Sequence, residues 1–157
     1  GGPELECRID RLMERLGMED FADRRSKGFS KGQILKVALA RALVHEPANV
    51  ILDEPTNGLD IGSSRAVREL IREIRDQGRC VLFSSHIMGE VEALCDRIIV
   101  ISDGLIVADG KPEELRQATG KGDLEEVFLA TVRQAEAASG GTGDGANNGA
   151  YSGTGRA

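Results

Sequence analysis

The sequence predicts an α/β fold in which parallel strands are flanked by helices and a β-hairpin follows toward the carboxyl end. Short apolar runs at 49–53 and 79–84 alternate with helical patterns, which is typical of layered α/β proteins. A third run at 97–102 leads into Asp103-Gly104, a hairpin turn signal, and the apolar segment after it supplies the returning strand. Both of the first two runs are continuously apolar, so we expect buried strands.

The helices are predicted from apolar spacing and from signals at their ends. Apolar residues at helical spacing predict a first helix over 4–16, which Gly17 would end. Residues 18–29 are charged and irregular. Five more helices are expected, at about 31–45, 62–77 and 87–95, from Pro112 onward, and over 123–137.

Length and composition limit the kind of protein. The 157 residues are 40% hydrophobic but only 3% aromatic, which predicts one domain with an aliphatic core. The net charge of −6 argues against a general nucleic-acid or anionic-membrane surface. Cys7, Cys80 and Cys95 show no close pairing, so we expect reduced, buried thiols and no disulfide or zinc site. No apolar run approaches the length of a membrane span.

Two adjacent carboxylates, Asp53 and Glu54, end the first apolar run. Like charges are costly in a poorly solvated place unless a positive group joins them. Strand alternation would point the two side chains to opposite faces. One could then hold Mg²⁺ through water while the other polarises an attacking water. The alternative is a strand that ends in two solvated acids before a turn.

Ser30-Lys31-Gly32-Gln33 opens the helix predicted at 31–45. Serine followed three residues later by glutamine is a capping box, in which each side chain binds a free amide at the helix start. A helix start that carries a glycine is also suited to bind an anion. Both interpretations can hold together.

His86 follows the second apolar run. A lone histidine after a strand is more often structural, although histidine is the commonest side chain for proton handling. The chain's other histidine, His45, lies at a predicted helix end and is expected only to complement the helix dipole.

The segment 53–60, DEPTNGLD, resembles the Walker B and D-loop sequence of ATP-binding cassette (ABC) ATPases. FSKGQ at 29–33 is similar to the signature of that family, usually written LSGGQ, and SSH at 84–86 resembles its switch segment. The resemblance implies part of a P-loop NTPase-like layered fold.

The resemblance also implies roles for individual residues. Asp53 would hold Mg²⁺ through water, Glu54 would be the general base for ATP hydrolysis, and His86 would contact the γ-phosphate. The remaining residues would contact nucleotide held by a second, head-to-tail subunit: Ser30, Lys31, Gly32, Gln33 and, at the dimer seam, Asp60.

The resemblance further implies a domain arrangement and partners. Residues 1–30 would be part of the helical subdomain, 31–120 the carboxyl-terminal part of the ATPase core and 121–138 a carboxyl-terminal helix. The Gly-rich segment 139–157 is expected to be a disordered tail. The partners would be a second ATPase subunit and a transmembrane permease, with the chain on the cytoplasmic face of the membrane and no nucleic acid bound. SKG in the signature and DLEEVFLATV at 123–132 are similar to bacterial exporters of the sodium- and drug-extruding kind.

No segment matches G-x-x-x-x-G-K-[ST], the Walker A loop that cradles phosphates, and no glutamine loop is recognisable. We therefore interpret the sequence as the carboxyl-terminal portion of an ABC ATPase and expect it to be inactive alone. Two alternatives stay open, a soluble ABC ATPase that moves no solute and a non-catalytic remnant.

Overall fold

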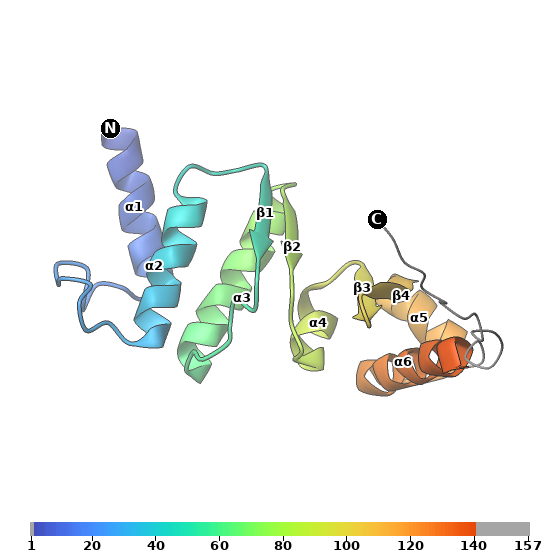
Figure 1. Ribbon diagram of the computed structural model, residues 1–157. Coiled ribbons are helices and arrows are strands. Elements are labelled where there is room, and N and C mark those ends of the chain that lie inside the picture. Colours follow the sequence, from blue (N-terminus) through green and yellow to red (C-terminus); the bar gives the residue numbers. More distant parts are fainter. Residues whose placement is uncertain (1, 141–157) are drawn as a thin grey trace, which may run out of the picture. The chain divides into compact units, whose positions relative to one another are not determined.

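The computed structural model describes residues 2–140 and divides the chain into two compact units, Gly1–Cys95 and Asp96–Ala157. Figure 1 shows their elements. The first unit holds α1 (Pro3–Leu16), α2 (Lys31–Leu43), β1 (Asn49–Leu52), α3 (Ile61–Asp76), β2 (Cys80–Phe83) and α4 (Met88–Leu94). The second holds β3 (Ile98–Ser102), β4 (Leu105–Gly110), α5 (Pro112–Thr119) and α6 (Leu124–Gly140). The predicted order of helices and strands is confirmed.

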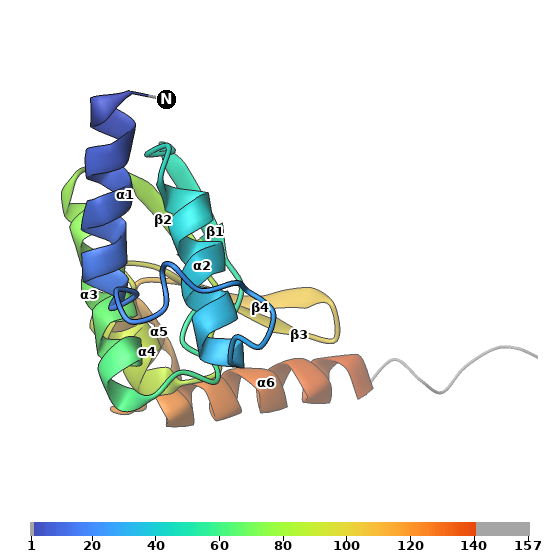
Figure 2. The same cartoon turned by 90° about the vertical axis from the view of Figure 1, so that its left-hand side faces the viewer.

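In the first unit, β1 and β2 form a parallel pair joined through α3, with Val50 opposite Val81. Helices α1, α2 and α3 lie on the same side of these strands (Figures 1 and 2). Alternate residues of β1, Val50 and Leu52, are buried in a shared core with these helices. This confirms the α/β class and its parallel strands.

The expectation of fully buried strands is wrong for the described residues. Ile51 of β1 is 78% exposed and its register partner Leu82 of β2 is 55% exposed. A strand points alternate side chains to opposite faces, and the helices described here cover one face only. The sheet is therefore apolar on both faces but buried on one.

The expectation of buried thiols is also wrong. All three cysteines are free, but Cys7 and Cys80 are exposed and Cys95 is half-buried. Cys7 lies on α1, which buries only Leu16. Cys80 is the first residue of β2, in which exposed residues alternate with half-buried ones.

The second unit is an antiparallel hairpin packed against two helices. Asp103 and Gly104 form its turn with φ values of 50° and 76°, which confirms the predicted turn signal. Helices α5 and α6 contact β4. Arg97 donates to both carboxylate oxygens of Asp109 at 2.8 and 2.9 Å, and this contact lowers the pKa of Asp109 below its usual range.

Within residues 2–140, none of the helices combines the length and the apolar content that crossing a membrane requires. The predicted carboxyl-terminal helix is α6, which extends to Gly140. Of the tail predicted at 139–157, residues 141–157 lie outside the described part of the chain.

Candidate active site

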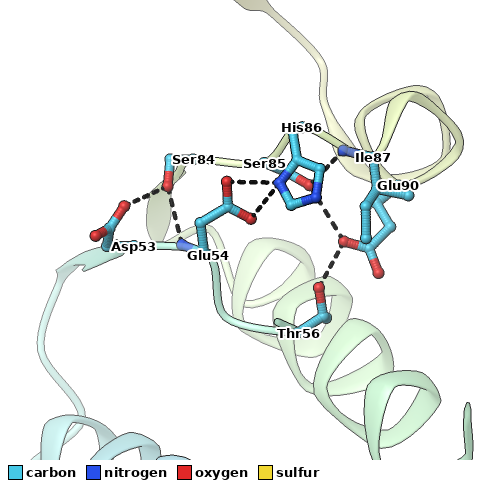
Figure 3. A network of polar contacts seen from close by, with 8 residues as sticks. All are labelled: Asp53, Glu54, Thr56, Ser84, Ser85, His86, Ile87 and Glu90. Atoms are coloured by element: carbon cyan, nitrogen blue, oxygen red, sulfur yellow. Dashed lines mark hydrogen bonds and ion pairs between the residues drawn. The ribbon is translucent and has the colours of Figure 1, made fainter. Parts of the chain in front are cut away.

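The candidate site lies where β1 and β2 end. Because the strands are parallel, the residues that follow them meet at one edge of the sheet, which is where α/β folds bind ligands. Asp53 and Glu54 follow β1, and Ser84, Ser85 and His86 follow β2 (Figure 3).

Ser84 joins the two strand ends. Its hydroxyl donates to Oδ1 of Asp53 at 2.6 Å and accepts the backbone N–H of Glu54 at 2.9 Å. Asp53 is exposed, and its other carboxylate oxygen accepts no hydrogen bond from residues 2–140. Ser84 thus fixes the backbone at Glu54 while it leaves one face of Asp53 open.

Glu54 has a left-handed backbone, with φ of 45°. This conformation costs a non-glycine residue roughly 1–3 kcal/mol and is concentrated at functional sites. Strand β1 ends at Leu52, before both acids, so the alternation expected from a strand over 49–53 does not separate them. They differ instead in their partners, since Asp53 binds Ser84 and Glu54 binds His86.

The ring Nδ1 of His86 lies 2.9 Å from Oε1 and 3.0 Å from Oε2 of Glu54. The hydrogen bond to Glu54, followed by its negative charge, raises the pKa of His86 above its ordinary value. The His86 side chain is 70% exposed and that of Glu54 is 31% exposed, so water reaches this pair. A carboxylate and an imidazole are therefore in direct contact at an open edge of the sheet.

Behind this pair lies a buried carboxylate, Glu90 of α4, which is only 4% exposed. It accepts the Thr56 hydroxyl at 2.8 Å and the Ser85 hydroxyl at 3.4 Å. The Ser85 oxygen also accepts the N–H of Ile87 at 3.1 Å. Glu90 thus joins the turn after Glu54 to the segment that carries His86 (Figure 3).

Sequence reasoning missed Ser84, Ser85, Thr56 and Glu90. Two features of the sequence could have indicated them. Hydroxyl residues stand within two positions of Glu54 and His86, and a glutamate lies four residues after His86. A glutamate one helical turn beyond a strand end can reach back to hydroxyls at that end.

The Ser30 helix start is built as predicted. The N–H of Gln33 donates to the Ser30 hydroxyl at 3.2 Å, and Oε1 of Gln33 accepts the N–H of Ser30 at 3.0 Å. The capping box is therefore confirmed. Lys31 is exposed and forms no hydrogen bond or ion pair with residues 2–140.

Gly32 brings this helix start beside the turn that follows Glu54. A Cβ added at Gly32 would lie 3.3 Å from Cδ2 of Leu59 and 3.7 Å from the carbonyl oxygen of Gly58. Two segments recognised separately in the sequence are thus neighbours in space. Between residues 30–33 and the trio Asp53, Glu54 and His86, no hydrogen bond or ion pair occurs in the described structure.

Asp60 is the N-cap of α3. Its Oδ1 accepts the N–H of Ser63 at 2.9 Å and its Oδ2 accepts the Ser63 hydroxyl at 2.7 Å. These hydrogen bonds lower the pKa of Asp60 below its ordinary value. Both carboxylate oxygens serve the cap, and the place of Asp60 at a dimer seam stays a prediction.

Asp53 is the residue that the sequence predicts to hold Mg²⁺. The part of the chain that the structure describes has no group of three or more His, Cys, Asp or Glu side chains that could hold a metal ion. Mg²⁺ binds proteins through one or two carboxylates and takes its other ligands from water and phosphate. The open carboxylate of Asp53 beside the Ser84 hydroxyl fits that mode of binding.

Comparison with known proteins decides the family. The model of the ABC transporter family matches residues 4–57. The ABC transporter ATP-binding protein NatA of Bacillus subtilis is 46% identical over 129 residues, which are 82% of this chain and 52% of NatA. The chain belongs to the ABC transporter family. The matched range includes Ser30, Asp53 and Glu54.

Other ABC proteins show the same relationship. The Nod factor export ATP-binding protein I of Rhizobium meliloti is 40% identical over 112 residues, 71% of this chain and 33% of that protein. A solved ATP-binding subunit of an ABC transporter superposes on this chain with a TM-score of 0.78 at 29% sequence identity. The matched region is 83% of this chain and 55% of the solved chain. This ABC chain thus spans about half or less of the length of these relatives, and its fold is that of part of an ABC ATP-binding subunit.

Proposed function

We propose that this chain supplies the signature, Walker B and switch elements of an ATP-hydrolysing ABC subunit that powers solute export through a membrane partner. The observation that carries the proposal is the contact of Glu54 with His86 beside Asp53 at one sheet edge. The names of the relatives, ATP-binding proteins of transporters or export systems, support ATP as the ligand and transport as the setting.

In the proposed reaction, Glu54 is the general base that takes a proton from the attacking water. His86 holds Glu54 in place and offers its ring to the γ-phosphate. Asp53 would hold Mg²⁺ through water, and the ion would offset charge on the phosphates when bound. Most of the catalytic effect then comes from positioning and electrostatics.

The helix start at Ser30, Lys31, Gly32 and Gln33 would close over nucleotide bound to a second subunit, with Asp60 at the seam. Free amides and the helix dipole favour an anion there. We further propose that the subunit works on the cytoplasmic face of the membrane with a permease. Residues 1–157 contain no Walker A sequence, so we expect the chain alone to hydrolyse little ATP.

The test replaces the matching part of NatA with this chain, so that a Walker A segment is present, and measures ATP hydrolysis and ATP binding. Glu54→Gln should lower turnover by about 100-fold or more, because general-base catalysis contributes roughly that much, while ATP still binds. The matched control is Glu113→Gln, which removes an exposed carboxylate on α5. Unchanged hydrolysis in Glu54→Gln would refute the role given to Glu54.

The same assay separates the alternatives. A chimera that hydrolyses ATP but stimulates no transport in permease vesicles would favour a soluble ABC ATPase. A folded chimera that binds ATP without hydrolysing it would favour a non-catalytic remnant.

A further inference from the structure

A small hollow in the first unit has no role in the proposed reaction. It has a volume of about 70 Å³ and is lined by α1, the residues that follow α2, and the carboxyl-terminal part of α3. Four arginines line it together with two glutamates: Arg8, Arg11, Arg15 and Arg79, with Glu46 and Glu73. The chain as a whole has a net charge of −6, so this concentration of arginine is local.

Two of the arginines are neutralised within the structure. Arg8 pairs with Glu46 at 3.2 Å, and Arg15 forms an ion pair with Glu73. Arg11 forms no ion pair or hydrogen bond with residues 2–140, although it lines the hollow. The lining therefore keeps an excess of positive charge.

Arg79 is held in place but is not fully satisfied. Its Nε donates to the carbonyl oxygen of Pro47 at 2.8 Å, and its Nη1 lies 3.3 Å from Oε1 of Gln77. Its Nη2 is buried and has no hydrogen-bond partner in the described structure. Buried charged donors without partners are rare and indicate an ion or water that completes the site.

We propose that this hollow binds a phosphate group. The fixed fork of a guanidinium matches the oxygens of phosphate, and several arginines around one group are typical of phosphate recognition. A volume of about 70 Å³ is several times what one water needs, so it admits one small polyatomic ion. Phosphate offers enough oxygens to accept from Arg79 and Arg11 at once.

This site is separate from the candidate active site and does not depend on the proposed function. Pro47 and Arg79 come before β1 and β2, whereas Asp53 and Ser84 come after them. Because the two strands are parallel, the hollow lies toward their amino ends and the active site at their carboxyl ends.

The test is calorimetric titration of the 157-residue chain with sodium phosphate, without magnesium and at constant ionic strength. Arg11→Gln should weaken binding about tenfold, because it removes a charge-assisted contact. Arg79→Gln should do the same. Arg25→Gln, an exposed arginine outside the hollow, is the matched control and should change affinity less than about twofold.

Parallel titrations with methyl phosphate and acetate identify the ligand. Tighter binding of inorganic phosphate assigns the site to the free ion, and tighter binding of methyl phosphate assigns it to the phosphate of a larger molecule; either supports the proposal. Absence of binding at phosphate concentrations on the order of 10 mM would overturn it. Equal binding of acetate, or an Arg11→Gln variant with unchanged affinity, would overturn it as well. Arg11 forms no hydrogen bond or ion pair with residues 2–140, so its replacement removes no polar contact from the fold, and circular dichroism of the variant checks that it is folded.

Discussion

At the scale of single residues, the contact of Glu54 with His86 sets the protonation of the histidine. The hydrogen bond and the charge of Glu54 raise the pKa of His86. A group whose pKa is higher in the folded state than in the unfolded state stabilises the fold at pH values below its unfolded-state pKa. The contribution of this pair is therefore complete below about pH 6.5 and is lost as the pH rises through the raised pKa.

Replacement of Glu54 by Gln should lower the pKa of His86 toward its ordinary value, because the charge and the strongest hydrogen-bond acceptor are removed. The measurement is an NMR titration of the His86 ring, with the ring of His45 as the internal reference in the same sample. Identical titration midpoints of His86 in the original protein and in the Glu54→Gln variant would show that Glu54 does not control the protonation of His86.

The sequence singled out the three residues that meet at the sheet edge in two ways. Asp53 and Glu54 were predicted from two adjacent carboxylates at the end of an apolar run, and His86 from the resemblance of SSH to the ABC switch segment. The sequence could not predict the backbone of Glu54. Left-handed conformations are usually predicted from Gly or Asn, and neither occupies this position. Nor could it predict that the buried Glu90 connects the two segments, since that depends on the tertiary placement of α4.

At the scale of elements, the capping box makes the start of α2 a defined structure before any ligand binds. Ser30 and Gln33 satisfy each other's backbone amides. Gly32 keeps this start close to Leu59 in the turn after Glu54. A change at the helix start should therefore affect both stability and the position of that turn.

Ser30→Ala should lower the free energy of unfolding by about 1 kcal/mol, because it removes the side-chain acceptor for the Gln33 amide. Ser30→Asp keeps an acceptor and should remain within about 0.5 kcal/mol of the original protein. Urea denaturation followed by circular dichroism measures both values. Equal losses in the two variants would mean that the hydroxyl contributes through something other than the cap.

Element boundaries were predicted to within a few residues where the sequence carries a stop signal. Gly17 ends α1 with φ of 56°, and Pro112 is the first residue of α5. The end of α2 was placed two residues too late, since the helix ends at Leu43 and Val44 is its C-cap.

At the scale of the whole molecule, the first of the two compact units is stabilised from one side of its parallel strands. Val67 of α3 and Leu16 of α1 are each 1% exposed, and they belong to one core with Leu52 of β1. Ile51, adjacent to Leu52, takes no part in that core. An apolar run shows that a strand can be buried but does not show how many faces are covered.

Leu52→Ala and Ile51→Ala form a matched pair that tests this asymmetry. Leu52→Ala should destabilise the chain by about 2–5 kcal/mol, because it opens a cavity in the core. Ile51→Ala should change the free energy of unfolding by less than about 0.5 kcal/mol, because the side chain is already 78% exposed. Chemical denaturation of both variants gives the comparison, and a large loss in Ile51→Ala would show that the second face is covered in solution.

The left-handed backbone of Glu54 has a consequence for how this chain can vary. Glycine at position 54 would relieve the conformational cost and would also remove the carboxylate that contacts His86. Thermostability thus favours glycine at position 54, whereas the proposed catalytic role favours glutamate. A laboratory selection for heat resistance alone would enrich glycine there, whereas under the role proposed for Glu54 a selection that also requires ATP turnover would retain glutamate.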